Sequence, residues 1–417
     1  MATFEKNWQY KKFCAYGFLK NLRFFDAFLL LFLLEKGLSY TEIGVIYATR
    51  EVIINFSEIP SGILADTLGR KYSLMASFMA YILSFSVFFF ATDLVFFIGA
   101  MILFGIADAF RSGTHKGMIM DYLKLNGWSD QKVHYYGHTR SWSQFGSALS
   151  ALAAGLLVLY FGSYRNVFLF SIIPYLLNFI NIATYPEEIN FSSKKKNLGK
   201  KRSFLGTFKS FFTEVKKPNV FRILNSTAMH SAYLKAVKDY IQPIMVGVAL
   251  LMPLTINDDP TKKSGIVIGI IYFFIFLMTS YASRNAGKFA AMDIKHLPLR
   301  SMLVGFMAGL TCGLFYNFDL LVVALLAFIM IYILENIRKP ILTGSMADNV
   351  PNDILTSVLS GQAFYQTILT SAIALTMGIV ADYAGVGIAL AISSGILMIG
   401  ALLTGPIRKI KLNESVD

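Results

Sequence analysis

Long apolar runs divide almost the whole chain, and they limit the folds open to it more than any other feature. A helix needs about 20 apolar residues to cross a hydrocarbon core about 30 Å thick. Strands of an outer-membrane barrel are shorter, with alternating patterns of about 10 residues. Twelve runs stand between polar residues, near 13–35, 41–65, 72–91, 94–123, 135–161, 165–185, 219–251, 264–283, 297–317, 319–347, 352–382 and 386–406. The sequence therefore predicts an all-α integral membrane protein with twelve transmembrane helices.

The composition excludes an ordinary soluble domain, because 55% of the residues are hydrophobic and only 15% are charged. The first run is long, carries Asp26 and lacks a small-residue cleavage site. We therefore expect it to stay as a membrane anchor rather than to be removed as a signal peptide. Cys14 and Cys312 lie in separate runs and predict neither a disulfide framework nor a thiolate metal site.

Basic residues account for the net charge of +13, and they gather on one side of a twelve-helix chain. They occupy its ends and alternate connections: Lys6, Lys11, Lys12, Arg70, Lys71, Lys194 to Arg202, Lys288, Lys295, Arg300, Arg408, Lys409 and Lys411. The positive-inside rule makes this side cytoplasmic, so both termini are expected in the cytoplasm and the protein in the cell (inner, cytoplasmic) membrane. We interpret the excess as an orientation signal with some attraction to anionic lipid, not as a nucleic-acid surface.

Three sequence patterns occur twice, in the same order and at nearly the same offset. Asp108-Ala-Phe-Arg111, Gly117 and Asp121 recur 227 positions later (335 − 108) as Glu335-Asn-Ile-Arg338, Gly344 and Asp348. Ile43 to Tyr47 recurs at Ile268 to Tyr272, and Gly155, Tyr160, Gly162 and Ser171 recur at Gly378, Tyr383, Gly385 and Ser394. Parallel repeats of this kind are a transporter architecture. We predict six-helix bundles at 1–185 and 216–417, joined by a basic cytoplasmic linker at 186–215.

The connection between the second and third runs reads Gly62-Ile-Leu-Ala-Asp66-Thr-Leu-Gly69-Arg70-Lys71. It closely resembles the cytoplasmic loop motif of the major facilitator superfamily, Gly-x-Leu-Ala-Asp-x-x-Gly-Arg-Arg/Lys. The number of runs, the duplication and the basic central linker extend this resemblance over essentially the whole chain. It implies two pseudo-symmetric six-helix bundles, with spans 1, 4, 7 and 10 around a central cavity.

The resemblance also implies that this loop holds the cytoplasmic side closed and opens with it. Its two glycines allow a close helix approach, Asp66 can bond a helix end, and Arg70 can bind a carboxylate. The alternative is that Arg70 and Lys71 only signal topology. In the second half, Ser283-Arg284-Asn-Ala-Gly287-Lys288 places Arg284 where Asp66 stands, which puts a symmetric gating role in doubt.

Ionisable residues lie near the middle of the predicted cavity helices, where each costs about 2.5–3.5 kcal/mol on insertion scales and marks a functional site. They are Asp108, Arg111, Lys235, Asp239, Glu335 and Arg338, with Asp26 somewhat toward the outside. Polar stripes at helical spacing add Glu51, His115, Arg140 with Gln144, and Gln362 with Tyr365. Together they predict a polar pocket for substrate and coupling ion.

Two interpretations of the repeated acid and arginine stay open. Asp108 with Arg111, and Glu335 with Arg338, are either ion pairs that tie helices together or parts of a binding site. In the second case the arginines donate to a carboxylate, phosphate or other oxyanion, and Lys235 adds a positive charge. Asp26, Asp108 and Glu335 then balance this charge or carry a coupling proton, with Glu335 and Asp108 the preferred proton sites.

His134 and His138 lie one helical turn apart, a spacing that can bind a transition metal, but the signal is weak because solvated or aromatic-packed histidines are ordinary near the cytoplasmic end of a span. We predict no metal site there, and no cofactor. His115 is the better candidate for a substrate contact or a proton relay.

The sequence thus predicts a monomeric secondary transporter, not an enzyme, that moves a small anionic or zwitterionic solute by alternating access with proton coupling. Proton-driven efflux of cationic or amphipathic drugs is the alternative, and transition-metal transport comes third. The chain contains no phosphate-binding loop of the Walker type, which argues against ATP as the energy source. Intramembrane charge disfavours a receptor or scaffold, since neither role needs it.

Overall fold

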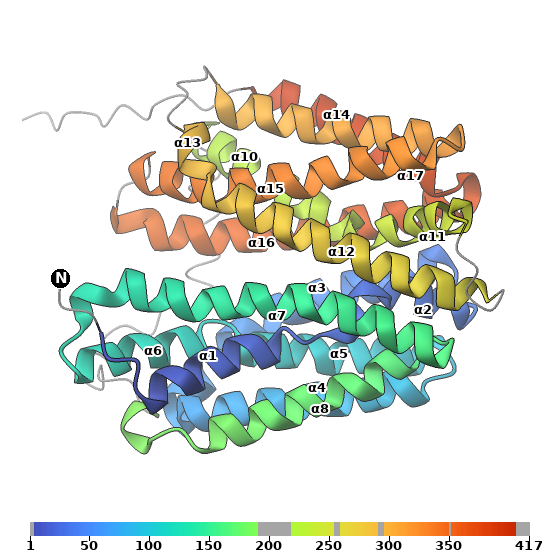
Figure 1. Cartoon of the computed structure of the whole chain (residues 1–417). Coiled ribbons are helices and arrows are strands. Elements are labelled where there is room, and N and C mark those ends of the chain that lie inside the picture. The colour runs from blue at the N-terminus through green and yellow to red at the C-terminus, as the bar shows by residue number, and fades with distance from the viewer. Residues whose placement is uncertain (1–3, 191–217, 254–258, 291–295, 350–351, 406–417) are drawn as a thin grey trace, which may run out of the picture. The chain divides into compact units, whose positions relative to one another are not determined.

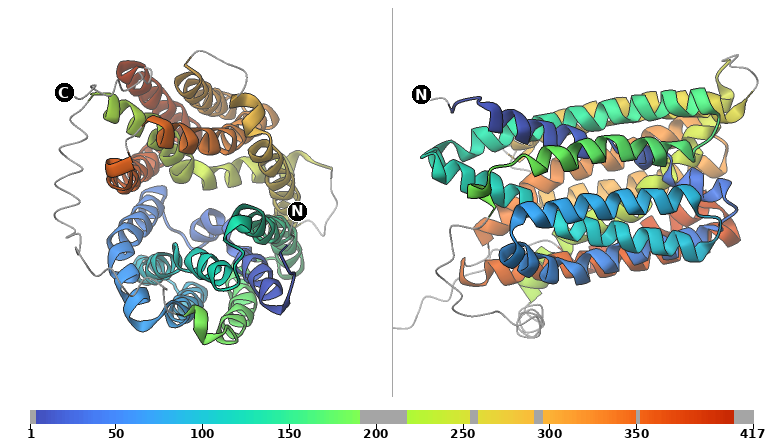
Figure 2. Two further views of the ribbon diagram at one scale, coloured as in Figure 1. Left: turned by 90° about the vertical axis from the view of Figure 1, so that its left-hand side faces the viewer. Right: turned by 90° about the horizontal axis from the view of Figure 1, so that it is seen from below.

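A computed structural model describes residues 4–190, 218–253, 259–290, 296–349 and 352–405, and helices are its only regular elements in these ranges (Figure 1). The chain divides into two compact units. Unit 1 comprises residues 1–200 and 245–276, and unit 2 comprises residues 201–244 and 277–417. Seen end-on, the helices within each unit form a bundle (Figure 2). The predicted domain boundaries stay a prediction, and most of the linker at 186–215 lies outside the described residues.

Unit 1 contains the helices of the first half of the chain. They are α1 (Trp8–Lys20), η1 (Phe24–Ala27), α2 (Leu29–Glu35), α3 (Tyr40–Leu68), α4 (Arg70–Phe90), α5 (Leu94–Arg111), α6 (Thr114–Leu125), η2 (Ser129–Gln131), α7 (Lys132–Phe161), α8 (Asn166–Ala183) and η3 (Glu187–Ile189). Most of α11 (Ile241–Leu251) and of α12 (Pro260–Arg284) also belongs to this unit. Unit 2 contains α10 (Pro218–Val237), η4 (Lys238–Tyr240), α13 (Ala286–Ala290), α14 (Leu297–Asn317), α15 (Leu321–Asn349), α16 (Asn352–Ala384) and α17 (Val386–Thr404).

Helix ends follow local sequence signals. Asn7 caps α1, Asp93 caps α5, and Ser39 forms a capping box with Glu42 at the start of α3. Gly69 separates α3 from α4 with a φ of 101°, a conformation that favours glycine.

Among the described residues, nine helices are long and apolar enough to cross a membrane. They correspond to nine of the twelve predicted runs, and the count of twelve stays a prediction. The other three runs are the first, second and seventh. The first and seventh are interrupted, at η1 and at η4, and the second carries the buried pair Arg50 and Glu51. Polar groups inside these helices lower their hydropathy.

The fourth run is also interrupted, although its sequence predicted one helix. It consists of α5 and α6, separated by Ser112 and Gly113, and Gly113 has a φ of 72°. Discontinuous membrane helices are typical of transporter sites, because the interruption releases backbone groups toward a ligand.

The duplication is visible in the local environments of matched residues. Ile43 and Tyr47 of α3 are buried, as are Ile268 and Tyr272 of α12. Ser171 donates to the Val167 carbonyl at 2.7 Å, and its counterpart Ser394 donates to the Leu390 carbonyl at 2.6 Å. These matched positions therefore share their burial or their hydrogen bond.

Candidate functional site

Asp108 receives hydrogen bonds from two arginines and a tyrosine in the interior of unit 1. Its Oδ1 lies 2.6 Å from Arg111 Nη2 and 3.3 Å from Arg23 Nη2, and it also accepts the hydroxyl of Tyr81. In the first copy of the repeat, Asp108 and Arg111 of α5 thus form an ion pair with each other. One oxygen of Asp108 therefore bonds both guanidinium groups of this cluster.

Two tyrosines hold the arginines of this cluster in place. Arg111 Nε donates to Tyr81 Oη at 3.0 Å, and Arg23 Nε donates to Tyr175 Oη at 2.8 Å. The hydroxyl of Tyr175 donates in turn to the carbonyl of Lys20 at 3.0 Å. That carbonyl belongs to the last residue of α1, so Tyr175 satisfies a backbone acceptor at the interruption of the helix.

A polar cavity of about 340 Å³ lies beside this interruption, between α1, α6 and α7. Two of its lining side chains are basic, Lys20 and Arg140, and none of the residues that line it is acidic. The predicted site residues His115, Arg140 and Gln144 all line it. The remaining lining residues are Phe13, Tyr16, Gly17, Asn21, Ile119, Tyr136, Thr139, Ser143 and Ser147.

Helical spacing gives this cavity its two main walls. Its α1 residues, from Phe13 to Lys20, share one face of that helix, and its α7 residues, from Tyr136 to Ser147, recur every three or four positions. The two helices cross closely at glycines. A Cβ at Gly146 would lie 2.6 Å from the Phe18 carbonyl oxygen, and one at Gly17 would lie 2.8 Å from Ser143 Oγ.

His115 lines the cavity and connects it to the segment after α8. Its ring stacks on Tyr16, with centroids 3.4 Å apart and planes inclined by 8°. Its Nε2 lies 3.1 Å from Tyr185 Oη. Both contacts fix the imidazole, so its position toward the cavity is defined by packing.

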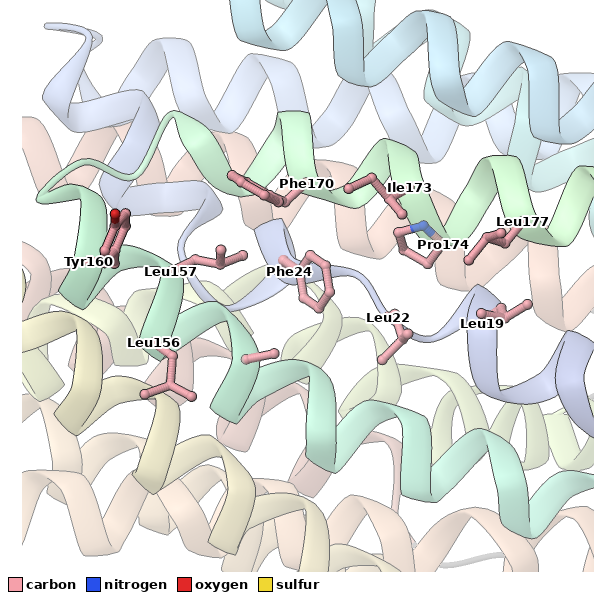
Figure 3. A pocket seen from close by; sticks show the side chains of 11 residues that line it. Leu19, Leu22, Phe24, Leu156, Leu157, Tyr160, Phe170, Ile173, Pro174 and Leu177 are labelled. Carbon is pink, nitrogen blue, oxygen red and sulfur yellow. The ribbon is translucent and has the colours of Figure 1, made fainter.

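A second hollow in unit 1 is apolar and shares α7 and α1 with the polar cavity. It measures about 470 Å³ and lies between α7, α8 and the segment from α1 to η1. Figure 3 shows Leu19, Leu22 and Phe24 of that segment with Phe170 and Leu177 of α8. The hollow offers almost no polar surface to hold a polar solute. The polar cavity is therefore the better candidate for the binding site.

In unit 2, Glu335 of α15 pairs with a histidine that the sequence analysis did not select. Its Oε2 lies 2.7 Å from His230 Nδ1 of α10, and its Oε1 accepts the hydroxyl of Ser231. The matched carboxylates Asp108 and Glu335 thus both bind a nitrogenous side chain from the first helical run of their own half, Arg23 and His230.

Arg338 has other partners, although it stands three residues after Glu335 as Arg111 stands after Asp108. Its guanidinium donates to the carbonyls of Pro298 at 2.6 Å and Ser226 at 2.8 Å, and to Ser301 Oγ at 2.6 Å. Only 2% of its surface is exposed. In the described structure Arg338 ties α15 to α10 and α14 and does not pair with Glu335.

The remaining predicted site residues lie on η1, α3, α10, η4 and α16. Asp26 is half-buried in η1, and Glu51 is buried on α3, 3.2 Å from Arg50 Nε. Lys235 is half-buried on α10, and Asp239 is buried, 3.7 Å from Lys238 Nζ. On α16, Gln362 is half-buried and Tyr365 donates to Asn225 Oδ1 at 2.9 Å.

The loop motif brings together two predicted features of the sequence. Arg70 Nη1 lies 2.5 Å from Asp121 Oδ2 of α6, and a Cβ at Gly117 would lie 2.7 Å from the same nitrogen. Gly117 and Asp121, singled out by the repeat, therefore form the binding site of the motif arginine. The side chains of their counterparts, Gly344 and Asp348, lie outside the described residues.

The next motif residue, Lys71, binds the segment after α8. Its Nζ donates to the Tyr185 carbonyl at 2.9 Å and to Glu187 Oε1 at 2.7 Å, while Asn190 Oδ1 accepts from the Lys71 amide. The hydrogen bond from Lys71 holds the pKa of Glu187 below its ordinary value. Gly62 is exposed, and the side chain of Asp66 lies outside the described set. In the second half, Arg284 and Lys288 are exposed.

His134 and His138 lie on α7, and the ring of His138 packs against Phe4. Both side chains are exposed. Within the part of the chain that the structure describes, no group of three metal-ligating side chains comes together. Among these described residues, His134 and His138 therefore have no third side chain with which to bind a metal.

Sequence reasoning missed Lys20, Arg23, Tyr81, Tyr175 and His230. The signal for Lys20, Arg23 and His230 was present, because each is a basic residue inside a predicted apolar run and meets the criterion that selected Arg111. The tyrosines carried no such signal, since tyrosine is also ordinary in membrane helices.

Comparisons with known proteins agree with this architecture. A mutant form of the nucleoside transporter NupG superposes with a TM-score of 0.75 at 15% identity, over 95% of this chain and 99% of that one. A D-xylose-proton symporter gives 0.68 at 14% identity, over 97% and 98%. A mutant form of the peptide transporter POT gives 0.70 at 11% identity, over 95% and 93%. At these identities the likeness shows the fold.

Sequence comparison gives the family. The uncharacterized MFS-type transporter YxaM of Bacillus subtilis (strain 168) is 32% identical over 104 residues, which are 24% of this chain and 26% of that protein. The chain thus matches about a quarter of the length of this curated relative. The sequence model of the Major Facilitator Superfamily matches residues 17–375, most of the chain. The chain therefore belongs to the major facilitator superfamily, a family of transporters and not of enzymes.

Proposed function

We propose that this protein is a secondary transporter that moves a small anionic or zwitterionic solute by alternating access, coupled to protons. The cavity between α1, α6 and α7 carries this proposal, because Lys20 and Arg140 line it and no acidic side chain does. Arg23 and Arg111 lie behind it with Asp108 as their shared carboxylate. Lysine and arginine side chains in this setting suit a carboxylate or phosphate of the solute.

The structural neighbours support a polar solute and a proton gradient. They include nucleoside, D-xylose and peptide transporters, and one is a proton symporter. A cavity of about 340 Å³ is at the small end of ligand pockets. The solute is therefore of metabolite size.

Orientation and gating follow from the basic connections and the loop motif. We place both termini and the Arg70–Asp121 pair on the cytoplasmic side of the cell membrane, in a monomer. The pair joins the start of α4 to α6, and Lys71 joins it to the segment after α8. In this proposal the network closes the cytoplasmic side and loosens when that side opens.

Ligand-induced thermal stabilisation of the purified protein tests the substrate class. The panel contains small carboxylates, phosphate esters, amino acids, nucleosides, sugars and organic cations. We expect an anion or a zwitterion to raise the melting temperature, and we expect Lys20→Gln to lose at least tenfold in affinity for it, about 1.4 kcal/mol. Lys11→Gln, on the exposed face of the same helix, is the matched control.

Stabilisation by an organic cation, undiminished in Lys20→Gln, would contradict the anion site and favour drug efflux. Uptake of the stabilising solute into proteoliposomes then tests coupling. A pH gradient should drive accumulation, and an uncoupler should abolish it.

A further inference from the structure

The polar cavity of unit 1 presents hydrogen-bond acceptors beside its two basic side chains. On α7, Thr139 Oγ1 donates to the Tyr136 carbonyl at 3.0 Å, and Ser147 Oγ donates to the Ser143 carbonyl at 3.2 Å. Both hydroxyl groups belong to residues that line the cavity, and each has given its one hydrogen to the helix backbone. What each hydroxyl group can still offer a solute is therefore an acceptor oxygen.

The amide of Asn21 adds a third acceptor on the α1 side of the cavity. Its Nδ2 donates to the Gly17 carbonyl at 2.8 Å, within the last turn of α1. This bond fixes the orientation of the amide, because the flipped amide would place two carbonyl oxygens against each other. Oδ1 of Asn21 is thus an acceptor for a solute in the cavity that this residue lines.

The roles of the other polar groups in the cavity are not fixed in this way. They can each donate or accept a hydrogen bond, and they belong to Tyr136, Ser143, Gln144 and His115. Lysine and arginine, in contrast, only donate. Selection between solutes therefore depends on two groups of side chains, the donors Lys20 and Arg140 and the three acceptor oxygens.

Charge decides which kind of donor suits these acceptor oxygens. Among the residues that line the cavity, Lys20 and Arg140 are basic and none is acidic. An ammonium group would be repelled by both cations and would meet no carboxylate in this lining. A hydroxyl group donates a hydrogen bond without carrying charge. Hydroxyl groups next to an anionic group therefore suit the cavity better than an ammonium group does.

Spacing along α7 indicates the length of the solute. Thr139 and Ser147 are eight residues apart (147 − 139), which corresponds to about 12 Å along the helix axis. Hydrogen bonds of about 2.8 Å at the two ends account for nearly half of this length. A solute that reaches both oxygens thus has outer hydroxyl groups about 6 Å apart, the length of a chain of about six carbon atoms.

We propose that the solute is a hydroxylated anion of sugar size, a sugar acid or a sugar phosphate. Its anionic group binds the two basic side chains, and its hydroxyl groups donate to Thr139, Ser147 and Asn21. Thr139 and Ser147 are then the residues that select hydroxyl groups. This inference rests on the proposed function, because it names the solute of the same cavity.

Isothermal titration calorimetry of the purified full chain with matched solutes tests this inference. Gluconate and hexanoate have carbon chains of equal length and the same charge, and they differ in their hydroxyl groups. We expect gluconate or glucose 6-phosphate to bind at least about tenfold more tightly than hexanoate, because hexanoate forms none of the three hydrogen bonds to the acceptor oxygens. The tighter of the two shows whether the anion is a carboxylate or a phosphate. 6-Aminohexanoate should bind no more tightly than hexanoate, and glucose should bind more weakly than gluconate.

Two substitutions on α7 test the acceptor oxygens themselves. Thr139→Val and Ser147→Ala should each lower the affinity for the hydroxylated anion by about threefold to tenfold and leave that for hexanoate unchanged. Ser141→Ala is the matched control, because Ser141 donates to the His138 carbonyl at 2.7 Å on the same helix but does not line the cavity. Thr139 is buried, so Ser147→Ala keeps the test open if Thr139→Val fails to fold.

Hexanoate or 6-aminohexanoate that binds as tightly as both hydroxylated anions would overturn this inference and leave the anionic or zwitterionic solute of the proposed function intact. Affinities for the hydroxylated anion that are unchanged in both Thr139→Val and Ser147→Ala would overturn it as well. An organic cation that binds when no anion does would overturn both proposals. The two failures are therefore distinguishable.

Discussion

Arg70 Nη1 lies 2.5 Å from Asp121 Oδ2, and the pair forms because residue 117, one turn before Asp121, is a glycine. The motif loop and the repeated element of the sequence thus meet at one point. A side chain at position 117 would require the Arg70 guanidinium to shift.

Gly117→Ala should therefore destabilise the protein by about 1–3 kcal/mol, because the new methyl group would overlap the Arg70 guanidinium. Unfolding in SDS, followed by circular dichroism, measures the free-energy change. Gly137→Ala is the control, since a Cβ there meets open space and alanine is the better helix former. Equal changes in unfolding free energy for the two substitutions would show that the Arg70 side chain shifts without a loss of stability.

Asp108→Asn should cost about 1–3 kcal/mol, because the half-buried guanidinium groups of Arg23 and Arg111 lose the carboxylate that they share. The double variant Asp108→Asn/Arg23→Gln should recover part of this loss, since it also removes one uncompensated charge. The same unfolding assay completes the cycle with Arg23→Gln alone. Strictly additive losses would mean that the two side chains do not interact.

Arg338→Ala should lower stability by about 2–5 kcal/mol, because the carbonyls of Pro298 and Ser226 lose their charged donor. Lys339→Ala, the exposed neighbour, should change stability by less than Arg338→Ala does. Ligand affinity at the cavity of unit 1 should persist in any Arg338→Ala protein that folds. Selective loss of binding with full stability would return Arg338 to the substrate site.

The Lys71–Glu187 pair should make stability depend on pH in acid. The hydrogen bond from Lys71 lowers the pKa of Glu187 in the folded protein. Its stabilisation is therefore complete above the ordinary glutamate pKa, about 4.3, and is lost as the pH falls through the lower, folded value. Melting temperatures of wild type and Glu187→Gln should converge in strong acid. Glu188→Gln should follow the wild-type profile, and a parallel Glu187→Gln profile would exclude the pair.

Helix positions were largely predictable, because apolar length and polar boundaries are properties of the sequence itself. The run predicted at 297–317 is α14, Leu297–Asn317, and the run at 72–91 is α4, Arg70–Phe90. The interruptions in the first, fourth and seventh runs were not predicted. Hydropathy records where a chain enters a membrane, and it is insensitive to a few residues that leave helical geometry around Asn21 or Gly113.

The sequence by itself determined membrane insertion, the duplication and the loop motif of the family. Only the tertiary structure decided the partners of the buried charges. Asp108 and Glu335 precede an arginine by the same three residues, yet Asp108 binds its arginine and Glu335 binds His230. The reason is that the spacing along one helix only brings the acid and the arginine within reach of each other. Each side chain then adopts the conformation in which most of its hydrogen bonds are formed. Neighbouring helices supply those bonds, Tyr81 and Arg23 in one unit and the acceptors of α10 and α14 in the other.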